Sequence, residues 1–163
     1  MNRPTWDEFF LKHCYLAATR SKDGKTKIGA VLVKDKRIIS SGYNGFPAKV
    51  RDLPERYENR EEKYKFICHA EFNACIFCAK NGVNPSGASL YCMSIPCGEC
   101  AKAAIQIGVS EVIHHTLWPN MGPKWEESIK YTKIMFEEAG ISLFGYDGKL
   151  GVQGMNDGKI IDV

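Results

Sequence analysis

The sequence predicts a single α/β domain in which one mixed sheet of five strands lies between two layers of helices. Its 163 residues suffice for one compact domain with a core, but not for two comfortable ones. Along the chain the apolar periodicity changes repeatedly between the helical and the extended kind. The resulting order is helix, strand, strand, helix, strand, helix, strand, helix, strand. Strands joined through helices tend to lie parallel, with helices on both faces of the sheet.

Each expected element has a local signal. Thr5 and Glu8 have the spacing of a capping box at the start of the first helix. Asp35-Lys36 joins two apolar runs and predicts a hairpin. Glycine follows each of the three later helical segments, as expected for C-terminal caps. The expected elements are helix 5–19, strand 28–33, strand 37–43, helix 69–80, strand 88–93, helix 97–107, strand 111–115, helix 124–139 and strand 141–144.

Two segments fall outside these elements. Residues 44–66 contain two prolines and eight charged positions between 51 and 62, so we expect a long loop with room for one short helix. A connection of that length in a small domain is usually functional. Residues 146–163 are rich in glycine and are expected to form turns or loosely ordered chain. We therefore assign the domain to residues 1–145 and a tail to 146–163.

Composition and charge restrict the class of function. The formal net charge is +3, apolar residues make up 44% and charged residues 25%. This balance is ordinary for a globular protein and predicts no basic face for a polynucleotide. No segment approaches the roughly 20 apolar residues of a membrane span, and the acidic N-terminal segment lacks the apolar run of a signal peptide. We expect no membrane contact, no nucleic-acid partner and a cytoplasmic location, in the host cytoplasm if the chain is viral.

Short motifs at two helix starts predict a catalytic metal centre. His69-Ala70-Glu71 opens one expected helix, and Pro96-Cys97 with Cys100 opens another. Two thiolates three positions apart at a helix N-terminus can bind one ion, with His69 as a third ligand. Three protein ligands leave the fourth position of a zinc ion for water, whose pKa the zinc lowers to near neutrality. Glu71 then lies where it can carry a proton without binding the metal.

Each of these motifs alone has a simpler interpretation. A lone C-x-x-C also occurs in redox pairs and in half of a structural zinc site, and a histidine at a helix start is usually a cap or a packed residue. The combination matches the H-x-E…P-C-x-x-C signature of zinc deaminases. The competing class is a non-catalytic zinc-binding assembly protein. Such a protein has no reason to retain Glu71, which is not a ligand.

Further segments resemble the cytidine and deoxycytidylate deaminase superfamily over about residues 20–113. The segment that points to the deoxycytidylate branch is Gly42-Tyr43-Asn44-Gly45, with its position before the metal motif. The resemblance implies a three-layer αβα sandwich of the cytidine deaminase type, one catalytic zinc per subunit, and hydrolysis of dCMP to dUMP and ammonia for thymidylate synthesis. The other matching segments are Ser21–Asp23, Ile28–Val31, Phe46-Pro47, Lys63-Tyr64, His69–Ala74, Pro96–Ala101 and Gly108–Ile113.

The resemblance also implies contacts with the substrate. Asn44 is expected to hydrogen-bond the sugar or the base, and the backbone carbonyl of Ser94 to accept from the exocyclic amine. The backbone N–H groups of Ala70 and Cys97 are expected to polarise the ring carbonyl and position the attacked carbon. For the substrate phosphate we predict three residues before the first strand: Arg20, Ser21 and Lys22.

Members of this family are commonly hexamers that dCTP activates and dTTP inhibits. We therefore predict a homo-oligomer with an effector site, in which Mg²⁺ accompanies dCTP. The resemblance places that site near a subunit contact. Its expected residues are Gly42, Tyr43, Asn44, Gly45 and Lys63.

Some alternatives stay open at this point. The substrate could be free cytidine or deoxycytidine, a 5-modified dCMP, or a base in a polynucleotide. By resemblance, the free-nucleoside branch usually lacks the helix expected at 124–139. Ile67 stands where some members place a histidine of a second zinc site, so we predict no such site.

Several other side chains have both a structural and a functional interpretation. For the pair Cys75 and Cys78, burial in the core is favoured over a second metal site. His114 and His115 either end a strand in solvent or line the substrate pocket. For Trp118 and Trp125, core packing is favoured over stacking on a base or on a neighbouring subunit. The remaining cysteines are expected to pack as small apolar residues; they are Cys14, Cys68 and Cys92.

Overall fold

A five-stranded mixed sheet forms the centre of the protein, in the order β2-β1-β3-β4-β5. The computed structural model describes residues 3–119 and 122–163. Strand β1 pairs antiparallel with both β2 and β3, whereas β3, β4 and β5 run parallel. Helices connect the parallel strands, which is the connection that parallel pairing requires. The strands are β1 (Gly29–Lys34), β2 (Arg37–Tyr43), β3 (Ser89–Cys92), β4 (Glu111–His115) and β5 (Ser142–Tyr146).

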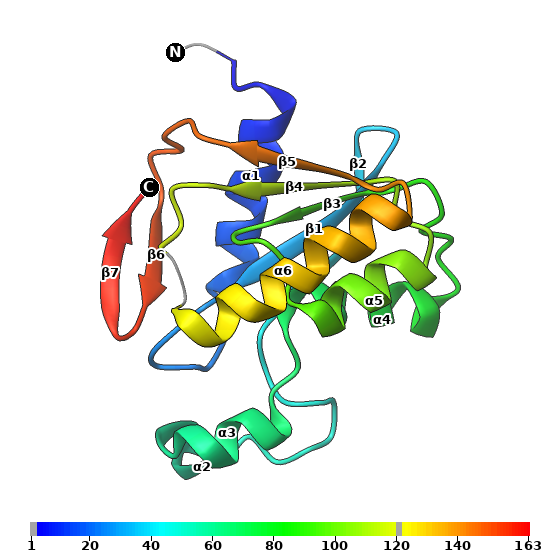
Figure 1. Ribbon diagram of the computed structural model, residues 1–163. Coiled ribbons are helices and arrows are strands. Elements are labelled where there is room, and N and C mark those ends of the chain that lie inside the picture. Colours follow the sequence, from blue (N-terminus) through cyan, green and yellow to red (C-terminus); the bar gives the residue numbers. More distant parts are fainter. Residues whose placement is uncertain (1–2, 120–121) are drawn as a thin grey trace.

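Helices cover both faces of this sheet, which confirms the predicted three-layer αβα sandwich (Figure 1). Helix α1 lies on one face, and α4, α5 and α6 lie on the other. Helix α6 crosses from β4 to β5 and so makes the last strand parallel to its neighbour. These helices are α1 (Trp6–Ala18), α4 (Ala70–Asn81), α5 (Gly98–Gln106) and α6 (Pro123–Glu138).

Successive strand residues point to opposite faces, so the protein has two buried clusters. On β4, Val112 packs in the cluster beneath α4, α5 and α6, while Ile113 packs in the cluster beneath α1. The next two residues continue this alternation. His114 therefore faces the α6 side of the sheet and His115 the α1 side.

The local signals for α1 and the first hairpin are confirmed. Thr5 Oγ1 accepts from the Glu8 N–H at 3.2 Å, and Glu8 Oε2 accepts from the Thr5 N–H at 2.7 Å. Asp35 and Lys36 both have positive φ, at 51° and 59°. This is the backbone that a tight two-residue β-hairpin needs.

The long connection between β2 and α4 contains two short helices, not one. Helix α2 (Pro54–Glu58) begins with a proline at its first turn, and α3 (Arg60–Phe66) begins after Asn59. The Asn59 side chain accepts from two backbone N–H groups at the start of α3. The proline and the Asn59 cap thus divide one charged segment into two helices. Figure 1 shows this helical pair extending away from the sheet.

The expectation of a loosely ordered tail was wrong. Strands β6 (Gln153–Asn156) and β7 (Lys159–Asp162) form an antiparallel hairpin. Its turn is Asp157-Gly158, with φ values of 49° and 75°, and Asp-Gly is one of the strongest short hairpin signals. Leu150 and Val163, on either side of the hairpin, are buried in the α1 cluster. No helix in the described residues is long and apolar enough to cross a membrane.

Candidate active site

A cavity of about 860 Å³ opens at the carboxyl ends of β3 and β4. Its walls come from the loop before β1, from α3, from the first residues of α4 and α5, and from one side of α6. Loops that follow parallel strands meet at this edge of a sheet, which is where α/β proteins usually bind ligands. The fold therefore brings together segments that are far apart in the sequence.

The three predicted metal ligands meet at one wall of this cavity, which His69 and Cys97 line. His69 Nδ1 lies 3.2 Å from Cys97 Sγ and 3.6 Å from Cys100 Sγ. All three ligand atoms lie within 4.8 Å of one another. In a tetrahedral site with the usual Zn–N and Zn–S bond lengths, nitrogen and sulfur ligands are about 3.6 Å apart. The donor set and its spacing fit one zinc ion.

The two helices that carry these ligands begin without a side-chain cap. His69 is the N-cap residue of α4 and Cys97 the N-cap residue of α5, and neither side chain caps its helix. Serine, threonine, aspartate or asparagine usually occupies this position because its side chain accepts from the first free N–H groups. Here the position is used to aim a ligand at the cavity. The positive end of each helix also favours a thiolate there.

The electrostatics of the cluster favour a charged sulfur at Cys97. Its neighbour Cys100, and then His69, lower the pKa of the Cys97 thiol against the opposing effect of burial. The same contact with Cys97, together with burial, raises the pKa of Cys100. Burial lowers the pKa of His69, but the contacts with Cys97 and Glu71 outweigh it and raise that pKa.

Glu71 lies beside the cluster in a position suited to proton transfer. Its side chain is only 4% exposed, and the Cys100 thiol donates to its Oε2 at 3.7 Å. Burial raises the pKa of Glu71, although His69 acts in the opposite direction. A carboxyl group with a raised pKa takes up a proton more readily near neutral pH. Glu71 lines the cavity and therefore faces any bound molecule.

The residues predicted to touch the base also line the cavity. Ala70, Ser94 and Cys97 surround its metal end, and Asn44 lies in another part of its wall. The Asn44 side chain is already engaged with protein: its Oδ1 accepts from the Ile28 N–H at 2.8 Å, and its Nδ2 donates to the Thr26 carbonyl at 2.8 Å. Asn44 is thus held in a fixed orientation at the cavity wall.

A buried ion pair fixes this part of the wall. Lys63 Nζ lies 2.9 Å from Asp23 Oδ2, and the two side chains are 9% and 2% exposed. Asn44 Nδ2 also approaches the same carboxylate oxygen, at 3.5 Å. Lys63 belongs to α3 and Asp23 to the loop before β1, so the pair ties the helical pair α2–α3 to the domain.

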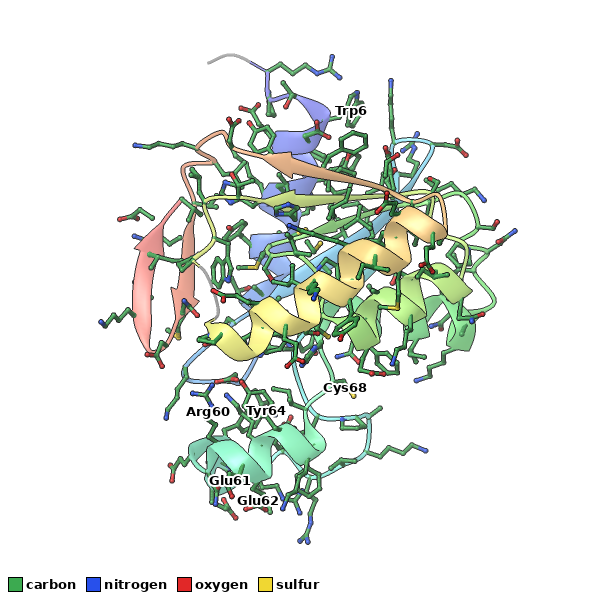
Figure 2. The ribbon with its side chains drawn as sticks, in the orientation of Figure 1. Trp6, Arg60, Glu61, Glu62, Tyr64 and Cys68 are labelled. Carbon is green, nitrogen blue, oxygen red and sulfur yellow. The ribbon has the colours of Figure 1, made fainter. Side chains whose placement is uncertain are left out.

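Helix α3 presents different side chains to the domain and to the outside (Figure 2). Arg60 and Tyr64 extend from it toward the domain, whereas Glu61 and Glu62 extend away. Tyr64 lines the cavity. Glu61 and Glu62 therefore lie on the side of α3 that faces away from the domain.

The residues predicted for the substrate phosphate lie elsewhere. None of Arg20, Ser21 and Lys22 lines the cavity. The Ser21 hydroxyl is buried and donates to the Asn44 carbonyl, and Lys22 pairs with Asp52 at 2.8 Å. Arg20 is exposed at the end of α1. Ser21 thus supports the cavity-lining residue Asn44 without lining the cavity itself.

Helix α6 contributes to the cavity, which the sequence did not indicate. Trp125, Lys130 and Lys133 line it, together with Lys63 of α3. The Trp125 ring is half-buried and lies 5.4 Å from the His69 ring, so its expected core packing was wrong. The spacing of Trp125, Ile129 and Lys133 marks one helical face, but sequence alone does not show that this face borders the cavity.

The two histidines at the end of β4 both line the cavity, as one of their two interpretations expected. His115 is 1% exposed, and both ring nitrogens are bonded, to the Tyr15 hydroxyl at 2.7 Å and to the Gly148 carbonyl at 3.0 Å. His114 faces α6, where burial and then the nearby Lys133 lower its pKa, against a backbone hydrogen bond at His115. The other expected core residue, Trp118, is indeed buried and packs near Tyr15.

The other cysteines are mostly buried. Cys75 and Cys78 lie on the inner face of α4 and are 1% and 0% exposed, which confirms the favoured interpretation. Cys14 and Cys92 are also buried, whereas Cys68 is only partly buried, near the end of the α2–α3 segment. Burial raises the pKa of Cys75 to about 12.

The residues predicted for an effector site lie where β2 meets helix α4 and the α2–α3 segment. Gly42 sits where β2 touches α4, since a Cβ there would lie 2.1 Å from the Ala70 carbonyl oxygen. Gly45 exchanges backbone hydrogen bonds with Cys68. Tyr43 is 40% exposed between them. The motif therefore joins the sheet, helix α4 and the α2–α3 segment at the surface.

Comparison with known proteins agrees with this geometry. The sequence model described as "Cytidine and deoxycytidylate deaminase zinc-binding region" matches residues 4–116. Human deoxycytidylate deaminase is 39% identical over 145 residues, which cover 84% of this chain and 77% of that protein. The structure of the cyanophage S-TIM5 dCMP deaminase in complex with dCMP and dUMP is similar, with a TM-score of 0.69 and 25% identity, and the match covers 90% of this chain and 100% of that one.

A more distant structural relative is a bifunctional enzyme from Thermotoga maritima. It is a diaminohydroxyphosphoribosylaminopyrimidine deaminase joined to a 5-amino-6-(5-phosphoribosylamino)uracil reductase. The match has a TM-score of 0.61 and 25% identity, and it covers 86% of this chain and 36% of that one.

Proposed function

Because the chain belongs to the cytidine and deoxycytidylate deaminase family and is a zinc-dependent hydrolytic deaminase, we propose that its substrate is dCMP. The reaction takes dCMP and water to dUMP and ammonia, and so supplies the precursor of thymidylate. The observation that carries the proposal is the His69, Cys97 and Cys100 cluster with the non-ligand Glu71 beside it in one cavity.

Different residues of the cavity have different roles in this reaction. His69, Cys97 and Cys100 hold the zinc, which supplies the Lewis acidity that makes a water more acidic next to the attacked carbon. Glu71 accepts one proton of the attacking water at its carboxylate and delivers it to the ring nitrogen, and it then carries the second proton of that water to the amine, which leaves as ammonia. The backbone N–H groups of Ala70 and Cys97 orient the ring carbonyl, and the Ser94 carbonyl accepts from the amine.

Two features of the cavity support a nucleotide over a nucleoside. Lys130 and Lys133 of α6 line it, and Lys63 also lines it but already pairs with Asp23. The similar cyanophage enzyme was solved with dCMP and dUMP. We propose that the phosphate lies against the α6 lysines, and not against Arg20, Ser21 and Lys22 as the sequence suggested.

We also propose regulation and self-association of this chain. The exposed side chain of Tyr43, next to the buried Gly42, Asn44 and Gly45, marks the surface that dCTP, with Mg²⁺, and dTTP would occupy. The outward face of α4 is apolar, since Phe72, Ile76 and Phe77 are 36%, 47% and 45% exposed. This apolar face supports a homo-oligomer in which a second copy of the chain covers it, with a hexamer favoured. The expected location is the cytoplasm, where free nucleotides occur.

The test is ammonia release by the purified, zinc-loaded protein. dCMP, deoxycytidine, dCTP, 5-methyl-dCMP and a cytosine-containing oligonucleotide are offered in parallel, each with and without added dCTP. Turnover of dCMP far above that of deoxycytidine is expected. Stimulation of dCMP turnover by dCTP would support the proposed effector site.

Other outcomes would change the proposal in different ways. Preferred turnover of the nucleoside or the oligonucleotide would keep the chemistry and overturn the choice of substrate. Silence on every substrate by a protein that binds one zinc per chain would contradict the catalytic role of Glu71. It would favour the non-catalytic assembly protein instead.

A further inference from the structure

Helix α6 contacts the metal centre through the backbone of the turn that carries Cys97. Thr132 Oγ1 donates to the Pro96 carbonyl at 2.9 Å, and Ser128 Oγ accepts from the Gly98 N–H at 2.8 Å. These two peptide groups lie immediately before and after Cys97. One helix therefore holds both sides of a metal-ligating residue.

The two hydroxyls reach the turn because they share one face of α6. Ser128 and Thr132 are four residues apart, which places them one above the other on the helix. Thr132 is 0% exposed, so its hydroxyl has no access to water and its bond to Pro96 is not exchanged for a solvent contact. The pair thus forms a fixed support beneath the turn.

Each bond acts on a specific property of the site. The Pro96 carbonyl and the Cys97 N–H belong to one planar peptide, so the Thr132 bond also sets the direction of that N–H. Gly98 is the first residue of α5, and its N–H has no partner inside the helix. The Cys97 side chain does not cap the helix, and Ser128 gives this first N–H a partner from outside it.

We propose that Ser128 and Thr132 are positioning residues for the metal centre. They hold the turn so that Cys97 Sγ stays at ligand distance from His69 and Cys100 while the Cys97 N–H stays directed for the substrate. This inference rests on the proposed zinc site but adds residues that touch neither the metal nor the substrate. Outer contacts of this kind are typically worth 10–100-fold in metal affinity.

A purely structural role of these two hydroxyls predicts a loss of stability without a change in zinc affinity. A buried hydroxyl-to-carbonyl bond stabilises a fold wherever it lies. Ser40 offers the matched control, since its Oγ donates to the Ala74 carbonyl at 2.7 Å and its side chain is 4% exposed. That bond joins β2 to the middle of α4 and flanks no ligand. Ser40→Ala therefore reports the loss of a buried bond alone.

The experiment measures zinc affinity by competition with a chromophoric chelator. The proteins are the wild type, Ser128→Ala, Thr132→Val, the double variant, Thr132→Ser and Ser40→Ala. Roughly tenfold weaker zinc binding is expected for each single variant at the turn, and up to about 100-fold for the double variant. Thr132→Ser keeps the hydroxyl and should bind zinc within about threefold of wild type. Ser40→Ala should lose thermal stability and keep its zinc affinity.

Spectra of the cobalt-substituted proteins give a second readout. Ligand-field bands of Co²⁺ shift when a thiolate moves, so they should change in Ser128→Ala and Thr132→Val and not in Ser40→Ala. Because Ser128 is less buried than Thr132, its variant keeps the test available even if Thr132→Val does not fold.

The outcomes separate this inference from the proposed function. A double variant that binds zinc as tightly as wild type, with an unchanged cobalt spectrum, would overturn the positioning role alone. A wild-type protein that binds no zinc would contradict the proposed function itself.

Discussion

The two ends of the cavity satisfy their polar groups in opposite ways. At the metal end, His69 and Cys97 occupy N-cap positions without capping, and Glu71 is buried with a long contact to a thiol. At the other end, Asp23 and Lys63 pair at 2.9 Å, and Asn44 bonds to the surrounding backbone.

This difference shows which end is built to hold something else. Buried polar groups in native proteins nearly always have partners within the protein. The second end follows this rule and is therefore a support. At the first end the buried groups contact mainly one another, through sulfur at 3.2–3.7 Å, and the two N-cap side chains do not cap their helices. Breaks of a local rule such as these missing caps are expected where a protein binds a ligand or performs chemistry. Substitutions at the first end should change function, and those at the second should change stability.

The largest expected effect is on turnover by Glu71→Gln. The amide has almost the same shape but cannot carry the proton, so kcat should fall by roughly 10³-fold, within the usual range for general acid–base catalysis. Zinc content should stay at one per chain. Because a buried carboxyl group with a raised pKa is replaced by a neutral amide, the thermal stability should not fall. Steady-state rates, metal analysis and melting curves check the three expectations. A near-normal rate would refute the assignment of Glu71 as the proton carrier.

The next effect concerns the other end of the cavity. Lys63→Met leaves the Asp23 carboxylate buried without its ion pair, and breaking such a pair typically lowers the free energy of unfolding by about 3 kcal/mol or more. Chemical denaturation measures this loss. The zinc affinity should stay near that of wild type, since Lys63 does not touch the ligands.

Lys22→Met is the matched control for this prediction. Lys22 pairs with Asp52 at 2.8 Å, but the two side chains are 66% and 36% exposed. Surface pairs of this kind contribute less than about 1 kcal/mol. Equal losses from the two variants would contradict the distinction between the buried and the exposed pair.

A smaller effect tests whether the metal end gives up helix stability. Thr5→Ala removes the capping box of α1 and should lower the free energy of unfolding by about 1 kcal/mol. Cys97→Ser should do the opposite in the presence of a chelator, because Cys97 already has N-cap backbone geometry and serine can cap from there. Its expected gain is about 0.5–1 kcal/mol, with loss of zinc binding. A loss of stability similar to that of Thr5→Ala would show that cysteine at position 97 does not lower the stability of α5.

The same contrast explains what the sequence could predict. His69, Glu71, Cys97 and Cys100 lie at helix starts, so short-range spacing and chemistry suffice to find them. The helices and strands of the sandwich likewise follow from local periodicity and caps. The parallel pairing of β5 follows from the helix before it.

The parts that were missed depend on long-range packing or on an unused local signal. Lys130 and Lys133 line the cavity because α6 crosses the sheet at a particular rotation, which no local pattern specifies. Arg20 and Lys22 are close in sequence to Asp23, which lines the cavity, but their own side chains do not line it. The Asp157-Gly158 turn, in contrast, was a readable hairpin signal that the glycine-rich composition obscured.

The smallest predicted effect is a pH dependence of stability, centred on the wall of the cavity next to α1. Burial lowers the pKa of His115, against the opposing hydrogen bond to the Gly148 carbonyl, and its ring lies among Tyr15, Tyr146 and that carbonyl. The folded protein then keeps this histidine neutral at pH values where the unfolded chain, with an ordinary histidine pKa of about 6.5, already binds protons. Stability therefore falls as the pH decreases through that value.

Between pH 7 and pH 6 the largest loss that one such histidine can cause is about 0.7 kcal/mol. His115→Gln removes the titrating group, so its free energy of unfolding should be lower at pH 7 but should change less between pH 7 and pH 6 than that of wild type. Denaturation curves at the two pH values, in the presence of a chelator so that zinc binding does not contribute, check the difference. An identical pH dependence in both proteins would mean that His115 is protonated in the folded state as readily as in the unfolded chain. The hydrogen bonds of a neutral His115 to Tyr15 and to the Gly148 carbonyl would then not be what stabilises this wall.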